Sequence, residues 1–407
     1  MKKIAVYLEA SPEWGGAFQY AMTLLGALAA LPPGTAEICC FHKNESWRPH
    51  IEALSLRGRT LRRRRGLRRL RRSLIRRLAF LARNPDHVRK AHSDANALIA
   101  EWNPDLLICA QSDFFLLPRN IGQIAPVHDL MHIYESGFPE VGTAKARTDR
   151  NRLFTGMAEN CAALLVDSPL GGEHLLDNFP VKPGQIRVLP YAAPQSLLRA
   201  EPRPPALNIP EAFMFYPAQF WEHKNHAGMA CALAEARKTR PDLHCVFSGS
   251  TGYSGYGPFR RKVEELGLEG AVTVAGYVDE GEMAWLYRKA RCLFMPTFFG
   301  PTNIPPLEAM ALGCPVAVSG IYAMSWQCGD AALYFDPGSI PDMARAMESI
   351  WPDEGLRARL REKGLEKHRQ WTEKEMQNRF LSIVMELLGA SDQVAADRRQ
   401  IAGAFYA

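Results

Sequence analysis

Short apolar runs alternate with amphipathic helical segments along most of the chain, and the whole pattern occurs twice. In the first half, the runs that predict strands are KIAVYLEA, AEICCFH, DLLICAQ, IAPVHDL, ALLVDS and IRVLPYA. The second half repeats the pattern with FMFYPAQF, HCVFSGS, AVTVAGYV, RCLFMPT, PVAVSG and ALYFDP. Strands separated by helices predict βαβ units and a largely parallel sheet. We therefore expect an α/β protein with two Rossmann-like domains that face each other across a cleft.

A proline-rich stretch separates the two halves. Residues 200–212 (AEPRPPALNIPEA) hold four prolines, which is typical of a linker. We expect an N-terminal domain at residues 1–200, a linker at 201–212 and a C-terminal domain at 213–371. The tail at residues 372–407 begins with a helical pattern and should pack back onto the N-terminal domain.

Cysteine usage and hydropathy indicate a cytoplasmic protein. The nine cysteines form no CxxC pair, which favours reduced thiols over a disulfide framework or a zinc ribbon. The apolar run at the start is interrupted by Glu9, so it predicts a first strand and not a signal peptide. No stretch reaches the roughly 18 apolar residues of a membrane span, so we expect a soluble or peripheral protein.

Residues 57–77 carry twelve arginines and no acid, whereas the whole chain has a formal charge of only +6. Without these charges the rest of the chain would stand at −6, so its basicity is confined to one surface. Leucines recur there at spacings of three and four, which predicts a basic amphipathic helix within residues 57–83 that lies on an anionic membrane. The predicted membrane-binding residues are Arg62, Arg63, Arg64, Arg65, Arg68 and Arg69.

Two alternatives compete with membrane binding by this segment. It could be a core helix with a solvated basic face, although it has no acids for pairing along the helix. It could also bind nucleic acid, but segments that do so usually interleave aromatic residues with the cations, and residues 57–77 contain none. No nucleic-acid partner is therefore expected.

The segment MPTFFGPTNIPPLEAMALGCPVAVSG, residues 295–320, keeps one acid, Glu308, in apolar surroundings. A buried strand should precede it, Pro305 and Pro306 suit a first helical turn, and Gly313 suits a helix C-cap. This reading puts Glu308 in the first turn, beside the carboxyl end of a strand, where open α/β sheets bind ligands. Alternatively, Glu308 only complements the helix dipole, which contributes roughly 0.3–1 kcal/mol.

Other candidate residues also follow predicted strands. Gly15 and Gly16 precede a helix, and their bare backbone would let N–H groups approach a phosphate. Lys224 would meet a diphosphate as a point charge, and His128 is a candidate catalytic residue. The structural alternatives are a tight turn, a solvated lysine and a satisfied histidine. No metal is expected, because His128 and His132 lack a recognised acidic partner. No nicotinamide cofactor is expected, because the G-x-G-x-x-G fingerprint is absent.

An ordered set of motifs resembles the retaining family-4 glycosyltransferases of the GT-B fold. The set is GGAFQY, VHDL, YPAQFWEHKNH, GYVDEGEMAWLYRKARCLFMPT, PPLEAMALGCPVAVS and GDAALYFDP. The resemblance covers most of the chain and is strongest at residues 213–345. It implies a metal-independent hexosyltransferase that uses a nucleotide-diphosphate sugar as co-substrate and has no cofactor.

The resemblance also implies roles for individual residues. Glu308 matches the second glutamate of the family's E-x7-E motif, which holds the donor ribose, and Lys224 matches the phosphate-binding lysine. His128 and Lys224 are the predicted catalytic residues. The remaining predicted donor-binding residues are Gly15, Gly16, Gln219, Val278, Gly300, Thr302, Asn303 and Ile304.

Two positions depart from the family pattern. The first glutamate of the motif, which reads the donor sugar, would fall at Gly300, and the arginine five residues before the lysine is replaced by Gln219. We expect Asn303 to contact a sugar hydroxyl instead. Lost activity is an alternative, although Lys224, Glu308 and His128 all remain.

The resemblance implies transfer of a hexose or deoxyhexose to a lipid-linked bacterial surface glycan, such as O-antigen, lipopolysaccharide or capsule. GDP-mannose is the donor that the similarity to O-antigen mannosyltransferases suggests. The protein would work in the cytoplasm, peripherally on the inner face of the cytoplasmic membrane. The alternatives are a nucleotide-sugar 2-epimerase of the GT-B fold and an arginine-rich nucleic-acid-binding protein.

Overall fold

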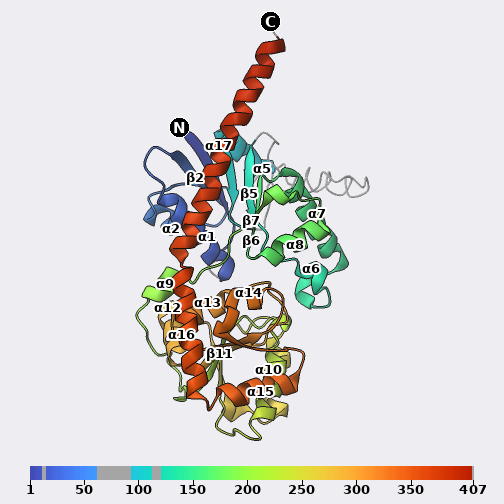
Figure 1. Ribbon diagram of the computed structural model, residues 1–407, viewed down its shortest axis with the longest axis vertical. Coiled ribbons are helices and arrows are strands. Elements are labelled where there is room, and N and C mark those ends of the chain that lie inside the picture. Colours follow the sequence, from blue (N-terminus) through green and yellow to red (C-terminus); the bar gives the residue numbers. More distant parts are fainter. Residues whose placement is uncertain (12–14, 62–92, 112–120, 406–407) are drawn as a thin grey trace, which may run out of the picture.

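The computed structural model describes residues 1–11, 15–61, 93–111 and 121–405 of the chain. Figure 1 shows two α/β domains stacked along the long axis of the molecule, each built around a sheet of parallel strands. The predicted fold class is therefore confirmed. The predicted membrane-binding residues lie outside the described residues: Arg62, Arg63, Arg64, Arg65, Arg68 and Arg69.

In the described part of the N-terminal domain, seven parallel strands follow the order β3-β2-β1-β4-β5-β6-β7. Their bounds are β1 (Lys2–Leu8), β2 (Ala36–His42), β3 (Arg57–Thr60), β4 (Leu106–Cys109), β5 (Gly122–Pro126), β6 (Ala163–Val166) and β7 (Ile186–Val188). The six runs predicted as strands in this half are strands. Helices cover both faces of a parallel sheet, so its strands read as continuous apolar runs.

The edge strand β3 is an element that the sequence analysis did not predict. Arg57–Thr60 opens the arginine-rich segment, and these residues pair with Cys39–His42 of β2. Arg57 forms an ion pair with Glu37 of β2, with 2.9 Å between nitrogen and oxygen. Charged residues suit an edge strand, because they discourage pairing with another chain. The predicted helix, which rests on the leucines from Leu67 to Leu81, lies outside the described residues.

Helices cover both faces of the N-terminal sheet. They are α1 (Gly16–Ala29), α2 (Trp47–Ala53), α5 (Ser93–Trp102), α6 (Met131–Tyr134), α7 (Ala144–Asn160) and α8 (Pro169–Asn178), with short turns η2 (Pro139–Val141) and η3 (Pro183–Gln185). Leu24 and Leu28 of α1 pack on one face, and Phe154 and Met157 of α7 pack on the other. α9 (Gln195–Arg199) then leads into the second domain.

The C-terminal sheet has six parallel strands in the order β10-β9-β8-β11-β12-β13. They are β8 (Met214–Pro217), β9 (Cys245–Ser248), β10 (Val272–Gly276), β11 (Cys292–Met295), β12 (Val316–Ser319) and β13 (Ala332–Phe335). The helices are α10 (His226–Ala236), α11 (Tyr256–Glu265), α12 (Glu280–Lys289), α13 (Ile304–Ala311), α14 (Met324–Cys328), α15 (Ile340–Ile350) and α16 (Glu354–Gln370), with turns η4 (Glu222–Lys224), η5 (Glu269–Ala271) and η6 (Gly329–Ala331). All six strands predicted in this half are present.

Helix α13 differs in one detail from the prediction. It begins at Ile304, so Glu308 is its fifth residue and lies in the second turn of the helix, not in the first as predicted. Gly313 follows the helix with a φ of +72°, as the C-cap prediction requires.

The last helix, α17 (Glu373–Phe405), returns the chain to the N-terminal domain (Figure 1). At the crossing, Trp371 Nε1 donates to the Tyr191 carbonyl at 3.0 Å, and Thr23 Oγ1 donates to Glu373 Oε1 at 2.9 Å. The α17 side chains buried in the N-terminal core are Met376, Phe380, Ile383, Val384 and Leu388. The chain therefore connects the two domains twice, through α9 and through α17.

Membrane-spanning segments were searched for among the described residues. No helix there is both long enough and apolar enough to cross a bilayer.

Candidate functional site

A cleft of about 680 Å³ lies between the two domains. Its walls come from the start of α1, from the α9 region, from the loops after β8, β9 and β10, and from α12 and α13. The predicted donor-binding residues that line it are Gly15, Gly16, Gln219, Val278 and Glu308. Ligands of open α/β sheets bind beyond the carboxyl ends of the strands, so this cleft is the candidate active site.

The glycine turn brings α1 close to the opposite domain. Gly15 has a φ of +55° and precedes α1, whose first N–H groups have no acceptor within the helix. A Cβ at Gly16 would lie 3.3 Å from Ile304 Cδ1 on α13. Glycine at position 16 therefore lets the two domains approach each other while the N-terminus of α1 lines the cleft, where it can bind an anion.

Glu308 reaches the cleft from α13. Tyr287 on α12 donates a hydrogen bond from its hydroxyl to Glu308 Oε2 at 2.7 Å. Burial raises the pKa of the Glu308 carboxyl to about 7; the Tyr287 bond opposes this rise, and the nearby Glu280 adds to it. The Tyr287 bond occupies only one oxygen, so the carboxylate retains acceptor sites for a hydroxyl-bearing ligand.

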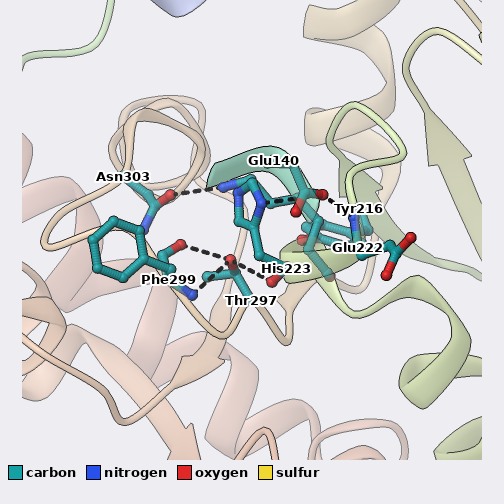
Figure 2. Close-up of polar contacts among 8 residues, drawn as sticks. Glu140, Tyr216, Glu222, His223, Thr297, Phe299 and Asn303 are labelled. Atoms are coloured by element: carbon teal, nitrogen blue, oxygen red, sulfur yellow. Dashed lines mark hydrogen bonds and ion pairs between the residues drawn. The ribbon is translucent and has the colours of Figure 1, made fainter. Parts of the chain in front are cut away.

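Lys224, at the end of η4, is not among the residues that line the cleft. Its side chain contacts Asn303, which immediately precedes α13. Lys224 Nζ donates to Asn303 Oδ1 at 3.3 Å, and this bond is the dashed line that begins at Asn303 in Figure 2. Burial lowers the pKa of Lys224 to about 8, while the negative charges of Asp129 and Glu140 in the N-terminal domain raise it. Lys224 therefore remains mostly charged at neutral pH.

Asn303 is held on several sides. Its Nδ2 donates to the Gly300 carbonyl at 3.2 Å and contacts Met324 Sδ at 3.4 Å. Gln327 holds the Asn303 backbone by accepting from its N–H at 3.0 Å and donating to its carbonyl at 2.7 Å. These bonds fix the orientation of the Asn303 amide beside Lys224.

The backbone at Gly300 explains the departure from the family pattern. Its φ is +127°, which L residues rarely adopt, and a Cβ there would lie 2.6 Å from Asn303 Nδ2. A glutamate at position 300 could not be accommodated unless the loop and Asn303 both moved. The Asn303 side chain can therefore lie where it does, beside Lys224, because residue 300 has no side chain.

Gln219 and Thr302 have structural partners. Gln219 Oε1 accepts from the Ser250 N–H at 2.6 Å, which ties the loops after β8 and β9 together at the cleft wall. Thr302 is buried, and its N–H and Oγ1 donate to Asp167 Oδ2 in the N-terminal domain at 3.0 and 2.5 Å. The structure thus places Thr302 at an interdomain contact, beside a second cavity of about 280 Å³, and not on the wall of the cleft.

His128 lies among aromatic side chains of the N-terminal domain. Its ring meets that of Tyr20 edge-on, with 4.9 Å between centroids, and its Nδ1 lies 2.9 Å from the Tyr191 hydroxyl. Burial lowers the pKa of His128 to about 4, so the ring is neutral at neutral pH. Its Nε2 is buried and has no hydrogen-bond partner in the described structure. His128 can therefore share one hydrogen bond with a ligand but does not supply a charge.

Three residues at the site were missed by the sequence analysis: Tyr287, Glu140 and Asp167. Asp167 directly follows β6, so the strand-end signal that singled out His128 would also have found it. Glu140 lies in the short turn η2 and Tyr287 lies within α12, where no local pattern indicates their role. Within the described ranges, no three His, Cys, Asp or Glu side chains gather in a way that could hold a metal ion.

Gly300→Ala should lower the melting temperature, because the new Cβ would clash with Asn303 and the backbone would be strained. Strain of this kind costs about 1–3 kcal/mol. Adding Asn303→Ala to this variant should restore only the part of the melting temperature that was lost through the clash, because the backbone strain at position 300 remains. Gly184→Ala is a matched control, because a Cβ at Gly184 meets no atom within 4 Å. An unchanged melting temperature for Gly300→Ala would show that the loop does not require glycine.

Glu308→Gln should stabilise the folded protein at pH values above 7. The folded pKa, about 7, lies above the ordinary value of 4.5, so the folded state binds the proton more tightly than the unfolded state. This contribution to stability is complete below about pH 4.5 and is lost as the pH rises through 7. Melting temperatures from pH 4 to pH 9 should therefore diverge between variant and parent, whereas Glu269→Gln, at an exposed site, should follow the parent. Parallel curves for Glu308→Gln would contradict the raised pKa.

Comparison with known proteins identifies the C-terminal domain. Residues 199–367 match the family model "Glycosyl transferases group 1". The O-antigen chain mannosyltransferase B of Escherichia coli is 26% identical over 181 residues, which are 42% of this chain and 47% of that protein. The MMP alpha-(1->4)-mannosyltransferase of Mycolicibacterium hassiacum is 25% identical over 312 residues, 66% of this chain and 74% of that protein. The chain spans about half the length, or less, of several curated relatives that it matches.

Solved structures resemble the whole chain. Sucrose-phosphate synthase from Thermosynechococcus elongatus has a TM-score of 0.72 at 20% identity and covers 96% of this chain and 100% of its own. Anabaena Alr3699/HepE in complex with UDP-glucose has a TM-score of 0.69 at 13% identity and covers 95% of this chain and 100% of its own. At these identities the likeness shows the fold. The chain therefore has the GT-B fold, and its residues 199–367 match the group 1 glycosyltransferase family.

Proposed function

We propose that this chain is a retaining glycosyltransferase that moves a hexose or deoxyhexose from a nucleotide-diphosphate sugar to a lipid-linked bacterial surface glycan. The observation that carries the proposal is the combination of groups at one interdomain cleft. A glycine turn and helix N-terminus form one wall of the cleft, and Glu308 of α13 lies on the other. The half-buried Lys224 does not line the cleft itself but bonds to Asn303, the residue before α13. A donor with a ribose and a diphosphate matches these groups.

In the proposed reaction, the bond between the anomeric carbon and a diphosphate oxygen breaks. The acceptor oxygen bonds to the same carbon on the same face, and its proton passes to the leaving phosphate oxygen. Negative charge therefore builds up on the diphosphate, where Lys224 and the N-terminus of α1 would stabilise it. These two groups would offset the charge, so the proposed reaction uses no metal.

The remaining groups suit donor recognition. Glu308 would accept hydrogen bonds from the ribose hydroxyls, which are strong in the ionised form of the carboxyl. Asn303 would contact a sugar hydroxyl by giving up its contact with Met324 Sδ, since sulfur is a weak acceptor. His128 Nε2, buried without a partner, is a candidate for a hydroxyl of the acceptor or of the transferred sugar.

The relatives support a nucleotide sugar as donor. HepE is described as a complex with UDP-glucose, and several curated relatives are mannosyltransferases, two of them of the O-antigen chain. GDP-mannose is thus the first donor to test. A thermal-shift screen against nucleotide sugars would identify the donor, because a bound ligand raises stability by RT ln(1 + [L]/Kd). Product analysis with and without acceptor would separate transfer from 2-epimerisation.

Lys224→Ala and Glu308→Gln should affect different kinetic parameters. Loss of the ammonium should lower kcat by about a hundredfold or more, because it removes stabilisation of charge that develops in the transition state. Loss of the carboxylate should mainly raise the donor KM, because the ribose contact is made before and during the chemical step. Steady-state kinetics with the donor found in the screen would measure both. Parental rate and affinity in both variants would show that the site is misassigned.

Membrane association is a separate part of the proposal and rests on the arginine-rich sequence. Replacing Arg62, Arg63, Arg64 and Arg65 with glutamine should abolish salt-sensitive binding to anionic liposomes, because each cation near the surface contributes about 1 kcal/mol. Activity on a short water-soluble acceptor should persist. Liposome binding that is unchanged by the four substitutions would contradict membrane association through this segment.

A further inference from the structure

Lys224 and Asn303 belong to two separate loops of the C-terminal domain. Lys224 ends η4 after β8, whereas Asn303 ends the loop between β11 and α13. Their side chains meet at 3.3 Å, so the geometry of this pair depends on how both loops are held. Each loop receives a hydrogen-bond acceptor from the N-terminal domain.

Asp167 holds the loop that carries Asn303. The carboxylate follows β6 of the N-terminal domain and is only 3% exposed. Its Oδ2 accepts from the Thr302 N–H at 3.0 Å and from Thr302 Oγ1 at 2.5 Å, while its Oδ1 accepts from Ser168 Oγ at 3.0 Å. Thr302 is the residue before Asn303, so Asp167 fixes the backbone from which the Asn303 side chain reaches Lys224.

Glu140 holds the loop that carries Lys224, as Figure 2 shows. Glu140 lies in η2 of the N-terminal domain, and its Oε1 accepts from the backbone N–H of Glu222, two residues before Lys224. The same oxygen lies 3.5 Å from His223 Nδ1. On the other side of this loop, Thr297 Oγ1 donates to the His223 carbonyl at 3.2 Å. η4 is thus fixed between the loop that follows β11 in its own domain and a carboxylate of the other domain.

We propose that Asp167 and Glu140 are positioning residues that assemble the Lys224–Asn303 pair only when the two domains are closed. The inference rests on the proposed function, because it concerns how the phosphate-binding and sugar-binding end of the same site is built. Neither carboxylate is among the residues that line the cleft. Domain separation would break both sets of bonds and leave the nucleotide-binding walls of the C-terminal domain intact.

Physical considerations favour this role over simple adhesion between the domains. A buried carboxylate loses its solvation, and this cost offsets much of the free energy that its hydrogen bonds gain. Asp167 and Glu140 would therefore add little to the adhesion between the domains. Both bind backbone N–H groups that lie within two residues of the pair, where a shift of about 1 Å can cost a hundredfold in rate. Burial also raises the pKa of Asp167 to about 6, although the Thr302 and Ser168 bonds oppose this rise.

Kinetics test the positioning role. Asp167→Ala and Glu140→Ala should each lower kcat by about ten- to a hundredfold, while the donor KM and the affinity for free nucleotide change less than about threefold. The double variant should lose less than the product of the single losses, because both residues support one arrangement. Thr302→Val, which removes the hydroxyl donor, should be impaired more than Thr302→Ser, which keeps it.

Tyr322→Phe provides the matched control. Tyr322 donates from its hydroxyl to Glu135 Oε1 at 2.6 Å, which is another interdomain bond but one that involves neither loop. Phenylalanine removes this bond and keeps the ring, which meets Phe299 of the Asn303 loop edge-on with 5.1 Å between centroids. This variant should retain kcat. If it loses as much activity as the carboxylate variants, or if those variants keep the parental kcat, the positioning role is wrong.

Hydrogen exchange on the full-length protein tests the coupling without any substrate. Asp167→Ala should speed exchange not only at Thr302 but also at residues 222–225, and Glu140→Ala should speed exchange at Thr302 as well as at Glu222. If each substitution affects only its own loop, the coupling is overturned. A parent protein that transfers no sugar from any donor would refute the proposed function, whereas exchange would still decide whether the two loops are assembled together.

Discussion

The structure depends on one geometric constraint: two parallel sheets meet at the edges where their strands end. In a parallel sheet every strand has its carboxyl end on the same edge, so the loops that follow the strands gather there. When two such edges face each other, residues far apart in sequence become neighbours. Gly16 lies against Ile304, and Asp167 bonds to Thr302. The cleft is consequently built from both domains.

The groups at this interface are held in states that differ from those in water. Burial lowers the pKa of Lys224 to about 8 and raises that of Glu308 to about 7. In both cases burial is the largest cause, so each group would be more easily charged in water. Asp129 and Glu140 partly offset this effect for Lys224 by supplying negative charge from the opposite domain. An anionic ligand beside Lys224 would supply such charge more directly, which is why an incompletely neutralised cation suits a phosphate-binding role.

The sequence predicted the sheets better than it predicted the contacts between them. Apolar runs located the strands because burial on both faces of a parallel sheet imposes a continuous pattern. The same pattern, combined with helix signals, placed Glu308 and Gly16 beside the cleft. It missed β3, because the four residues Arg57–Thr60 carry no apolar run. It also missed the partner of Thr302, because a bond to Asp167 joins residues 135 positions apart and leaves no local trace.

The loop at residues 300–303 shows how a departure from a family pattern can remain consistent within one structure. A glutamate at position 300 would need a side chain in the space that Asn303 now fills, on a backbone with a φ of +127°. Glycine permits that backbone and allows the Asn303 amide to bond to the Gly300 carbonyl while its oxygen meets Lys224. The acid is therefore replaced by a neutral amide that is fixed by neighbours on both sides. A neutral group beside Lys224 leaves the positive charge of the lysine available to a diphosphate, whereas a carboxylate in the same position would compete for it.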